Sequence, residues 1–263
     1  HACRVDGYFH VVTANTRSAE NLIRCCTRQD LVVEDLFLQQ LAAAQAVLTK
    51  DERELGVCLA DIGGGTTDLA IYKDGVLRHT AVARLGGHHF TSDLARELKA
   101  PMAEAERIKI KYGCVHPEMV KDVETFEVAG LGGRKPRVLP REHLISWLEP
   151  RAAEIVSWIR HEIERVCPVE ELASGLVLTG GTASLAGLPE LAAEICGDVP
   201  TRVGEPQGLG GLSGVVKRPG FAAPVGLVLL AARGGAGPRT SQRVHAAGRV
   251  WQRFMQWAEE VGL

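Results

Sequence analysis

One octapeptide decides the fold of this chain: Asp61-Ile62-Gly63-Gly64-Gly65-Thr66-Thr67-Asp68. An apolar run at residues 56–60 leads into it and a second one follows at residues 69–72, which predicts two short strands joined by a glycine turn. Asp74-Gly75 then predicts a hairpin turn into a third strand at residues 76–83. We therefore expect three sequential antiparallel strands with a glycine turn between the first two.

The three glycines of this turn suit an anion. Without Cβ atoms, successive backbone N–H groups can come close to a phosphate. Asp61, at the end of a strand, can hold Mg²⁺ through water beside phosphates, and Thr66 and Thr67 add hydroxyl donors. The structural alternative is a tight hairpin whose glycines only satisfy geometry. The aspartates on both flanks and the strands on both sides favour a phosphate site.

A second glycine motif lies later in the chain, at residues 178–188. An apolar strand pattern runs into Gly180-Gly181, and a helix pattern follows from Leu188. Such a turn lets a flat ring or a phosphate approach the backbone closely. The motif is common in α/β proteins when it stands alone, but its pairing with the first motif, in this order, is specific.

The pair resembles the second phosphate loop and the adenosine loop of the actin, Hsp70 and sugar-kinase superfamily. Longer stretches, at residues 48–80, 103–114, 175–188 and 222–231, resemble the FtsA family of bacterial cell-division proteins, and the similarity runs from about Val5 to the C-terminus. The resemblance implies the C-terminal part of an α/β actin-like ATPase fold. This is a ribonuclease-H-like mixed sheet with flanking helices, an inserted small subdomain and a terminal amphipathic helix.

The resemblance also implies ATP and Mg²⁺ as ligands and gives individual residues a role. Asp61 would place Mg²⁺ or the attacking water and act in any hydrolysis. The β- and γ-phosphates would be held by the turn, with the residues Gly63, Gly64, Gly65, Thr66 and Thr67.

The ribose and adenine would lie on two other segments. Residues 105–109 fit an A-E-x-x-K helix, so Glu106 and Lys109 would flank the ribose; without the resemblance they read as a solvated helix face. Gly180, Gly181 and Ser184 would border the adenine.

The resemblance divides the chain into five parts. We expect the end of an FtsA-specific small domain and its link at residues 1–50, an actin-like core at 54–85 plus 172–235, an inserted subdomain at 86–171, a linker at 236–242 and a membrane-targeting helix at 243–263. The inserted part carries a basic patch at residues 132–137, in the subdomain that in this family docks the tubulin-like partner FtsZ.

The tail has the pattern of an amphipathic helix beyond a flexible linker. Apolar and aromatic residues recur at three- and four-residue spacing, and arginines lie towards the other side. This suits the headgroup region of an anionic bilayer, through Arg249, Val250, Trp251, Arg253, Phe254 and Trp257. The alternative is a terminal helix docked on its own domain, against which the linker argues.

Composition excludes other classes of protein. The formal net charge is -2, and neither a basic stripe nor a paired-cysteine zinc pattern appears, so no nucleic-acid partner is expected. The seven cysteines are an odd number without a C-x-x-C, which is typical of free thiols in a reducing cytoplasm.

Several local patterns complete the prediction. Residues 8–14 and 30–37 are rich in apolar and β-branched residues and predict strands, and residues 49–53 predict a charged surface connection. Residues 141–166 predict a long helix that is interrupted or restarts at Pro150. The chain begins at His1 and lacks the family's other phosphate loop, an Asp-Gly-Thr hairpin, so we expect an N-terminal truncation.

The expected function is that of an ATP-binding protein that polymerises with itself, tethers the FtsZ ring to the cytoplasmic face of the membrane at the division septum, and recruits other division proteins. It would be attached peripherally, and any ATPase activity would be weak and serve switching. One rival is a nucleotide-binding adaptor of the related pilus-assembly type. Another is a sugar-type kinase, for which a membrane tail would be pointless.

Overall fold

The computed structural model describes residues 10–120, 124–130, 135–210 and 213–233. The described residues form two compact units, one that comprises residues 10–14 and those described between 37 and 233, and one of residues 15–36. The larger unit holds both glycine motifs. Within the described part of the chain, no helix has both the length and the apolarity needed to cross a membrane.

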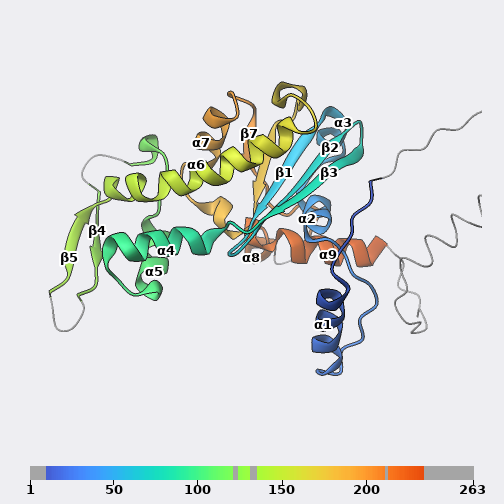
Figure 1. Cartoon of the computed structure of the whole chain (residues 1–263), viewed down its shortest axis with the longest axis horizontal. Helices are drawn as coiled ribbons and strands as arrows, with labels where there is room; N and C mark the ends of the chain where they lie inside the picture. Colours follow the sequence, from blue (N-terminus) through green and yellow to red (C-terminus); the bar gives the residue numbers. More distant parts are fainter. Residues whose placement is uncertain (1–9, 121–123, 131–134, 211–212, 234–263) are drawn as a thin grey trace, which may run out of the picture. The chain divides into compact units, whose positions relative to one another are not determined.

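A five-stranded mixed sheet, in the order β3-β2-β1-β6-β7, forms the centre of the larger unit (Figure 1). The first three strands are sequential and antiparallel: β1 (Val57–Ile62), β2 (Thr67–Lys73) and β3 (Val76–Ala83). The other two, β6 (Leu176–Thr179) and β7 (Thr201–Val203), run parallel to β1. The predicted three-strand arrangement is confirmed, and the fold is α/β with a mixed sheet.

Helices cover both faces of this sheet, as Figure 1 shows. Because side chains alternate along a strand, Cys58, Ala60 and Ile62 join one core while Val57 and Leu59 join the other. The first core includes α4 (Gly87–Leu98), α5 (Met102–Tyr112), α6 (Glu142–Glu164) and α7 (Leu188–Ile195). The second includes α2 (Gln39–Val47) and α9 (Ala222–Arg233).

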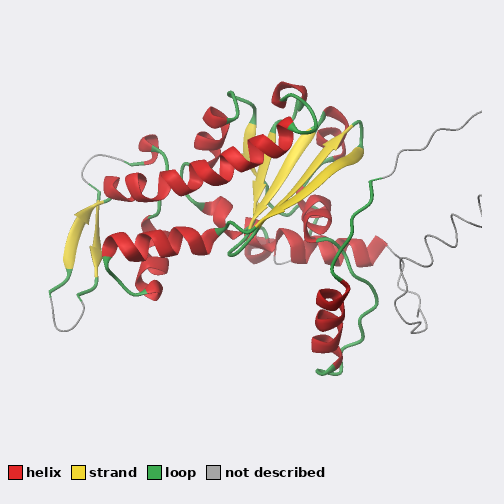
Figure 2. Ribbon diagram, viewed as in Figure 1, coloured by secondary structure: helices red, strands yellow, loops and turns green. Residues whose placement is uncertain are grey.

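Shorter elements connect these layers. They are α3 (Lys50–Leu55), α8 (Ser213–Val216), and the 3-10 turns η1 (Pro117–Met119), η2 (Val169–Glu171), η3 (Gly181–Ser184) and η4 (Pro219–Phe221). A separate two-stranded sheet of β4 (Thr125–Val128) and β5 (Arg137–Pro140) lies beyond α4 and α5, apart from the main sheet (Figure 2).

The helices α2 and α9 pack closely against each other. A Cβ atom built on Gly226 of α9 would lie 1.7 Å from the carbonyl oxygen of Ala42 in α2. Only a residue without a side chain allows the two backbones to approach so far. This contact matters for the site because both helices contribute to its wall.

The smaller unit has one described helix, α1 (Thr16–Thr27). Asn15 caps it, since its side-chain oxygen accepts hydrogen bonds from the amides of Arg17 and Ser18 at 2.9 and 3.3 Å. None of its residues is buried.

Several local predictions were wrong. Residues 10–14 and 30–37 form no strand, because a strand needs a neighbour, and no ladder partner faces them in the described chain. Val11 and Val32 are 76% and 78% exposed. The charged connection predicted at residues 49–53 is present and is helical. Thr49 caps α3 and no residue of this helix is buried; the Thr49 hydroxyl accepts from the Glu52 amide, and the Glu52 carboxylate accepts from the Thr49 amide.

The predicted break at Pro150 is absent as well. The helix α6 runs through this proline without interruption. Pro150 has no N–H, so the carbonyl of Ser146 one turn earlier loses its helical donor. Both residues are exposed, so water can satisfy that carbonyl and the helix continues.

Candidate functional site

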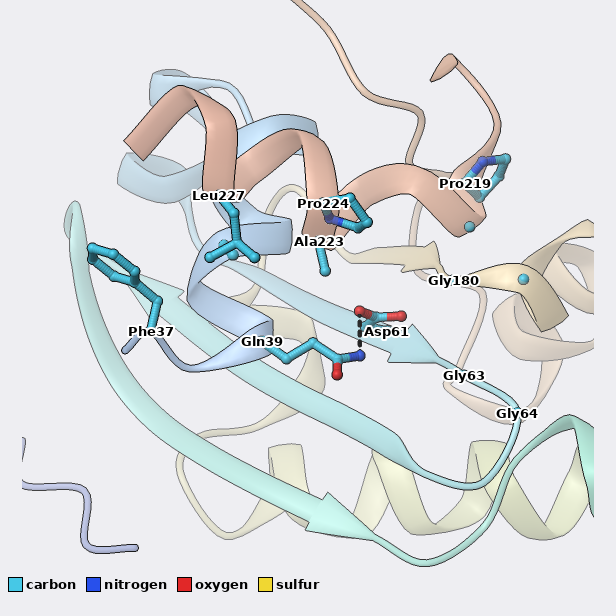
Figure 3. Close-up of a pocket in the computed structure, with 13 residues that line it drawn as sticks. Phe37, Gln39, Asp61, Gly63, Gly64, Gly180, Pro219, Ala223, Pro224 and Leu227 are labelled. Atoms are coloured by element: carbon cyan, nitrogen blue, oxygen red, sulfur yellow. Dashed lines mark hydrogen bonds between the residues drawn. The ribbon is translucent and has the colours of Figure 1, made fainter. Parts of the chain in front are cut away.

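Asp61 lies at the carboxyl end of β1 and is only 3% exposed. Gln39, in the first turn of α2, donates a hydrogen bond from Nε2 to Asp61 Oδ2 at 2.9 Å (Figure 3). Asp68 of β2 is the direct cross-strand partner of Asp61 and is also buried. Two carboxyl groups thus lie side by side at one end of the sheet.

Their surroundings disfavour negative charge. Burial raises the pKa of Asp61; the Gln39 hydrogen bond acts in the opposite direction, and the neighbouring Asp68 raises the pKa further. Burial also raises the pKa of Asp68, against a lowering by the Thr66 hydroxyl. A cation at this place would relieve the cost of ionising Asp61.

The glycine turn after β1 is closed by a hydrogen bond from the amide of Gly63 to the carbonyl of Thr66, at 2.8 Å. The two threonine hydroxyls are engaged within the protein: Thr66 donates to Asp68 at 2.9 Å, and Thr67 to the carbonyl of Leu85 at 2.8 Å. The amides of residues 64 and 65, unlike these hydroxyls, have no hydrogen-bond partner in the described chain.

The carbonyl groups of the same turn are held from the opposite side. Gly63 O accepts from the amide of Gly87 at 2.9 Å and from Thr182 Oγ1 at 3.0 Å. Gly64 O accepts from the amide of His88 at 2.7 Å. The first turn of α4 and the 3-10 turn η3 therefore both anchor this turn.

The second glycine motif meets the first at Asp61. Gly180 follows β6, has a positive φ of 85°, and would place a Cβ atom 2.4 Å from Asp61 Oδ1 and 2.5 Å from the carbonyl oxygen of Ile62. A side chain does not fit there. The amide of Gly180 is held by the carbonyl of Pro219 at 3.3 Å.

A cavity of about 560 Å³ opens between these segments. The two glycine turns and Asp61 form one side, and α2, η4 and α9 form the other (Figure 3). Its lining comprises Phe37, Gln39, Ala42, Asp61, Gly63, Gly64, Gly180, Gly181, Pro219, Gly220, Ala223, Pro224 and Leu227. Four predicted glycines and Asp61 are brought together here.

Other predicted site residues lie outside this lining. Gly65 and Ser184 are exposed, at the turn after β1 and at the end of η3. Lys109 Nζ bonds Glu106 Oε2 at 2.8 Å and the carbonyl of Gly87 at 3.0 Å, so both α5 residues attach to the first turn of α4. Burial alone would raise the pKa of Glu106, but the hydrogen bonds from Lys109 and Thr91 outweigh this and lower it.

Sequence reasoning missed Gln39, Thr182 and the wall formed by η4 and α9. Gln39 begins an alanine-rich helix, and only its position beside Asp61 distinguishes it. Thr182 belongs to the second motif, but its contact with Gly63 depends on the fold. The predicted membrane residues, 249–257, lie outside the described residues.

The chain is similar to known proteins over most of its length. A family model described as "Cell division protein FtsA" matches residues 58–226. The cell division protein FtsA of Pseudomonas aeruginosa is 43% identical over 226 residues, which are 86% of this chain and 54% of that protein. The chain thus spans about half the length of this relative.

Solved structures share the fold. MreB 5 of Spiroplasma citri bound to AMPPNP matches with a TM-score of 0.70 and 18% identity, over 84% of this chain and 66% of that one. The MamK double helical filament matches with a TM-score of 0.63 and 20% identity, over 83% and 66%. The fold is therefore actin-like, and the chain belongs to the FtsA family of cell division proteins.

Proposed function

We propose that this protein binds ATP and Mg²⁺ in the cavity beside Asp61 and works as an actin-like filament that tethers the FtsZ ring to the cytoplasmic membrane. The observation that carries the nucleotide part is the convergence of both glycine turns on one buried carboxyl group, Asp61. The chain spans 54% of the length of its relative from Pseudomonas aeruginosa. The activity of a whole FtsA-type protein is therefore proposed for this chain and does not follow from the similarity alone.

The residues present fit a phosphate group. The amides of Gly64 and Gly65 are unengaged in the described structure, and no Cβ atom shields them. The described residues contain no group of three or more side chains that could hold a metal ion by themselves. That agrees with Mg²⁺, which proteins usually bind through one or two carboxylates, phosphate oxygens and water. Asp61 would hold it through water, and the cation would neutralise phosphate charge.

Gln39 and Asp61 together can orient a water molecule. Their side chains are hydrogen-bonded at 2.9 Å and both line the cavity. An amide offers both a donor and an acceptor, which is how a glutamine positions water in other phosphate-transfer sites. Any hydrolysis would therefore depend on this pair.

The base and ribose positions extend the proposal. Gly180 and Gly181 line the cavity and would border the adenine, with Ser184 at the end of the same 3-10 turn. Glu106 and Lys109 would lie towards the ribose.

Self-association and the division partners rest on the family. A related fold forms the MamK double helical filament, which supports assembly into filaments with other copies of this chain. FtsZ and other division proteins are the partners expected of the family, at the septum. The tail would lie on anionic lipid as a peripheral anchor through its aromatic residues and arginines.

Asp61→Asn tests the nucleotide site. The substitution keeps an oxygen for Gln39 to bind but removes the charge, so Mg²⁺-dependent affinity for a fluorescent ATP analogue should fall by about 10- to 100-fold, as for other groups that hold a metal through water. Affinity without Mg²⁺ should hardly change. Titration of the 263-residue chain in magnesium and in EDTA measures both values.

Asp74→Asn is the matched control, because Asp74 lies in the β2–β3 hairpin and pairs with Arg78, outside the cavity lining. It should bind the analogue like the unmodified chain. Equal Mg²⁺ dependence in Asp61→Asn and the unmodified chain would contradict the role of Asp61. Absence of analogue binding by the unmodified chain would contradict nucleotide binding itself and favour the adaptor.

The tail is tested by co-sedimentation with vesicles. The full chain should pellet with phosphatidylglycerol-containing vesicles, and a chain ending at Arg239 should stay in solution. Arg249→Ala should weaken binding to anionic vesicles by roughly fivefold, since each arginine near such a surface contributes about 1 kcal/mol. Its binding to neutral phosphatidylcholine vesicles should not change. If the full chain and the shortened chain behave alike, the membrane anchor is refuted.

A further inference from the structure

The glycine turn at residues 63–66, proposed to hold phosphate, is called the phosphate turn below. Side chains as well as backbone groups hold its carbonyl side. We call the groups that hold it the brace. Three of them bond the turn directly: the amides of Gly87 and His88 and the hydroxyl of Thr182. The fourth, the ammonium of Lys109, acts indirectly, because it bonds the carbonyl of Gly87. Thr182 is the one member whose side chain bonds the turn directly, at 3.0 Å to Gly63 O.

Peptide geometry connects the two sides of the turn. In a trans peptide the C=O and the following N–H point in opposite directions. The C=O of Gly63 shares a peptide with the amide of Gly64, and the C=O of Gly64 with the amide of Gly65. Because both carbonyls bond to the brace, both amides face away from it. The brace thus determines the direction of the two amides proposed to hold phosphate.

Lys109 is fully used inside the protein. A lysine ammonium has three N–H donors. Its neighbours are the carbonyl of Gly87 at 3.0 Å, Thr91 Oγ1 at 2.9 Å and Glu106 Oε2 at 2.8 Å, and its side chain is 13% exposed. The ammonium therefore pins the first turn of α4, whose amides bond the phosphate turn. It has this role before any ligand arrives.

The close approach of α4 to the phosphate turn also explains why residues 86 and 87 are both glycine. A Cβ atom on Gly86 would lie 2.7 Å from Gly63 O, and one on Gly87 would lie 2.8 Å from Thr182 Oγ1. The turn, the start of α4 and η3 therefore meet almost backbone to backbone. A shift of any one of them moves the turn.

We propose that Thr182 and Lys109 are positioning residues for the phosphate turn, acting on its carbonyl side so that the Gly64 and Gly65 amides stay directed away from α4. The inference rests on the proposed phosphate role of the turn. In this proposal Lys109 affects phosphate binding indirectly, by positioning the turn. The alternative is that Lys109 only contacts the ribose.

The first arm of the test needs no nucleotide. Thr182→Val keeps the shape of the side chain and removes the hydroxyl, and Lys109→Met removes the ammonium. Both should speed hydrogen exchange of the Gly87 and His88 amides by about 3- to 10-fold, the effect of losing one supporting hydrogen bond. Thr182→Ser should restore the rate of the unmodified chain. Lys111→Met is the matched control, on the same helix and outside the brace.

The second arm separates phosphate from ribose. ATP and inorganic tripolyphosphate compete with a fluorescent ATP analogue, and Thr182→Val and Lys109→Met should weaken both competitors by the same factor, about 3- to 10-fold. If Lys109→Met weakens ATP but not tripolyphosphate, Lys109 is a ribose contact and its positioning role is wrong. If the hydrogen-exchange rates of the Gly87 and His88 amides are unchanged in both variants, the proposed positioning role of Thr182 and Lys109 is wrong. If the unmodified chain binds neither competitor, the nucleotide proposal fails. The hydrogen-exchange measurement then decides by itself whether Thr182 and Lys109 hold the turn.

Discussion

Gly226→Ala is expected to lower the free energy of unfolding by about 2–4 kcal/mol, a large effect for one methyl group. The added Cβ would lie 1.7 Å from the carbonyl oxygen of Ala42 and 2.3 Å from its carbonyl carbon. Both atoms belong to the backbone of α2, so no flexible side chain can move aside. The two helices must separate, and the buried alanines between them lose contact.

The change should appear as a fall in melting temperature of roughly 5–15 °C. It should also weaken the nucleotide site, since α2 carries Gln39 and α9 carries Ala223 and Leu227 of the cavity wall. Gly214→Ala is the control: Gly214 lies in helix α8 with nothing within 4 Å of its added Cβ, so alanine should be neutral or stabilise by up to about 1 kcal/mol. Equal melting temperatures for the two variants would mean that α2 and α9 are not packed backbone to backbone.

Local chemistry made most of the fold predictable. The β2–β3 hairpin follows from Asp74-Gly75, whose φ angles of 56° and 74° are the positive values that a two-residue hairpin turn needs. The strands next to it are continuous in sequence, so their pairing needs no distant partner. In contrast, β7 has three residues and pairs, among the described strands, with β6, from which η3 and α7 separate it in the sequence; it was not predicted. Residues 30–37 show the converse, since apolar β-branched residues without a ladder partner form no strand.

The candidate site was predictable in its glycines and less so elsewhere. Gly63 and Gly180 stand out because consecutive glycines at strand ends are unusual, and the structure brings them to one cavity. Gln39 and Thr182 have no such signature. Their roles come from tertiary contacts, with Asp61 at 2.9 Å and Gly63 O at 3.0 Å, and no local pattern encodes those distances.

Gly180→Ala is expected to abolish measurable binding of the ATP analogue, a loss of more than about 100-fold, or roughly 2.8 kcal/mol. The new Cβ would meet Asp61 Oδ1 at 2.4 Å and Ile62 O at 2.5 Å. The first atom belongs to the carboxyl group that Gln39 holds, and the second to the backbone of β1. Either the carboxyl group leaves its place or the two glycine turns separate, and both changes dismantle the cavity wall.

Two costs overlap in this variant, a clash and a backbone strain, and Gly197→Ala is the control for a positive φ without a clash. Gly197 has a φ of 86°, almost the 85° of Gly180, but nothing lies within 4 Å of its added Cβ. It should therefore show only the strain of a left-handed alanine, about 1–2 kcal/mol of stability, and bind the analogue normally. Gly180→Ala should lose clearly more stability, because the new Cβ meets Asp61 and β1 and because its φ of 85° and ψ of 168° form a backbone conformation that is essentially restricted to glycine. If both variants unfold at the same urea concentration and both bind the analogue, Gly180 is needed only for its backbone angle, and the close contact between the two glycine turns does not support the site.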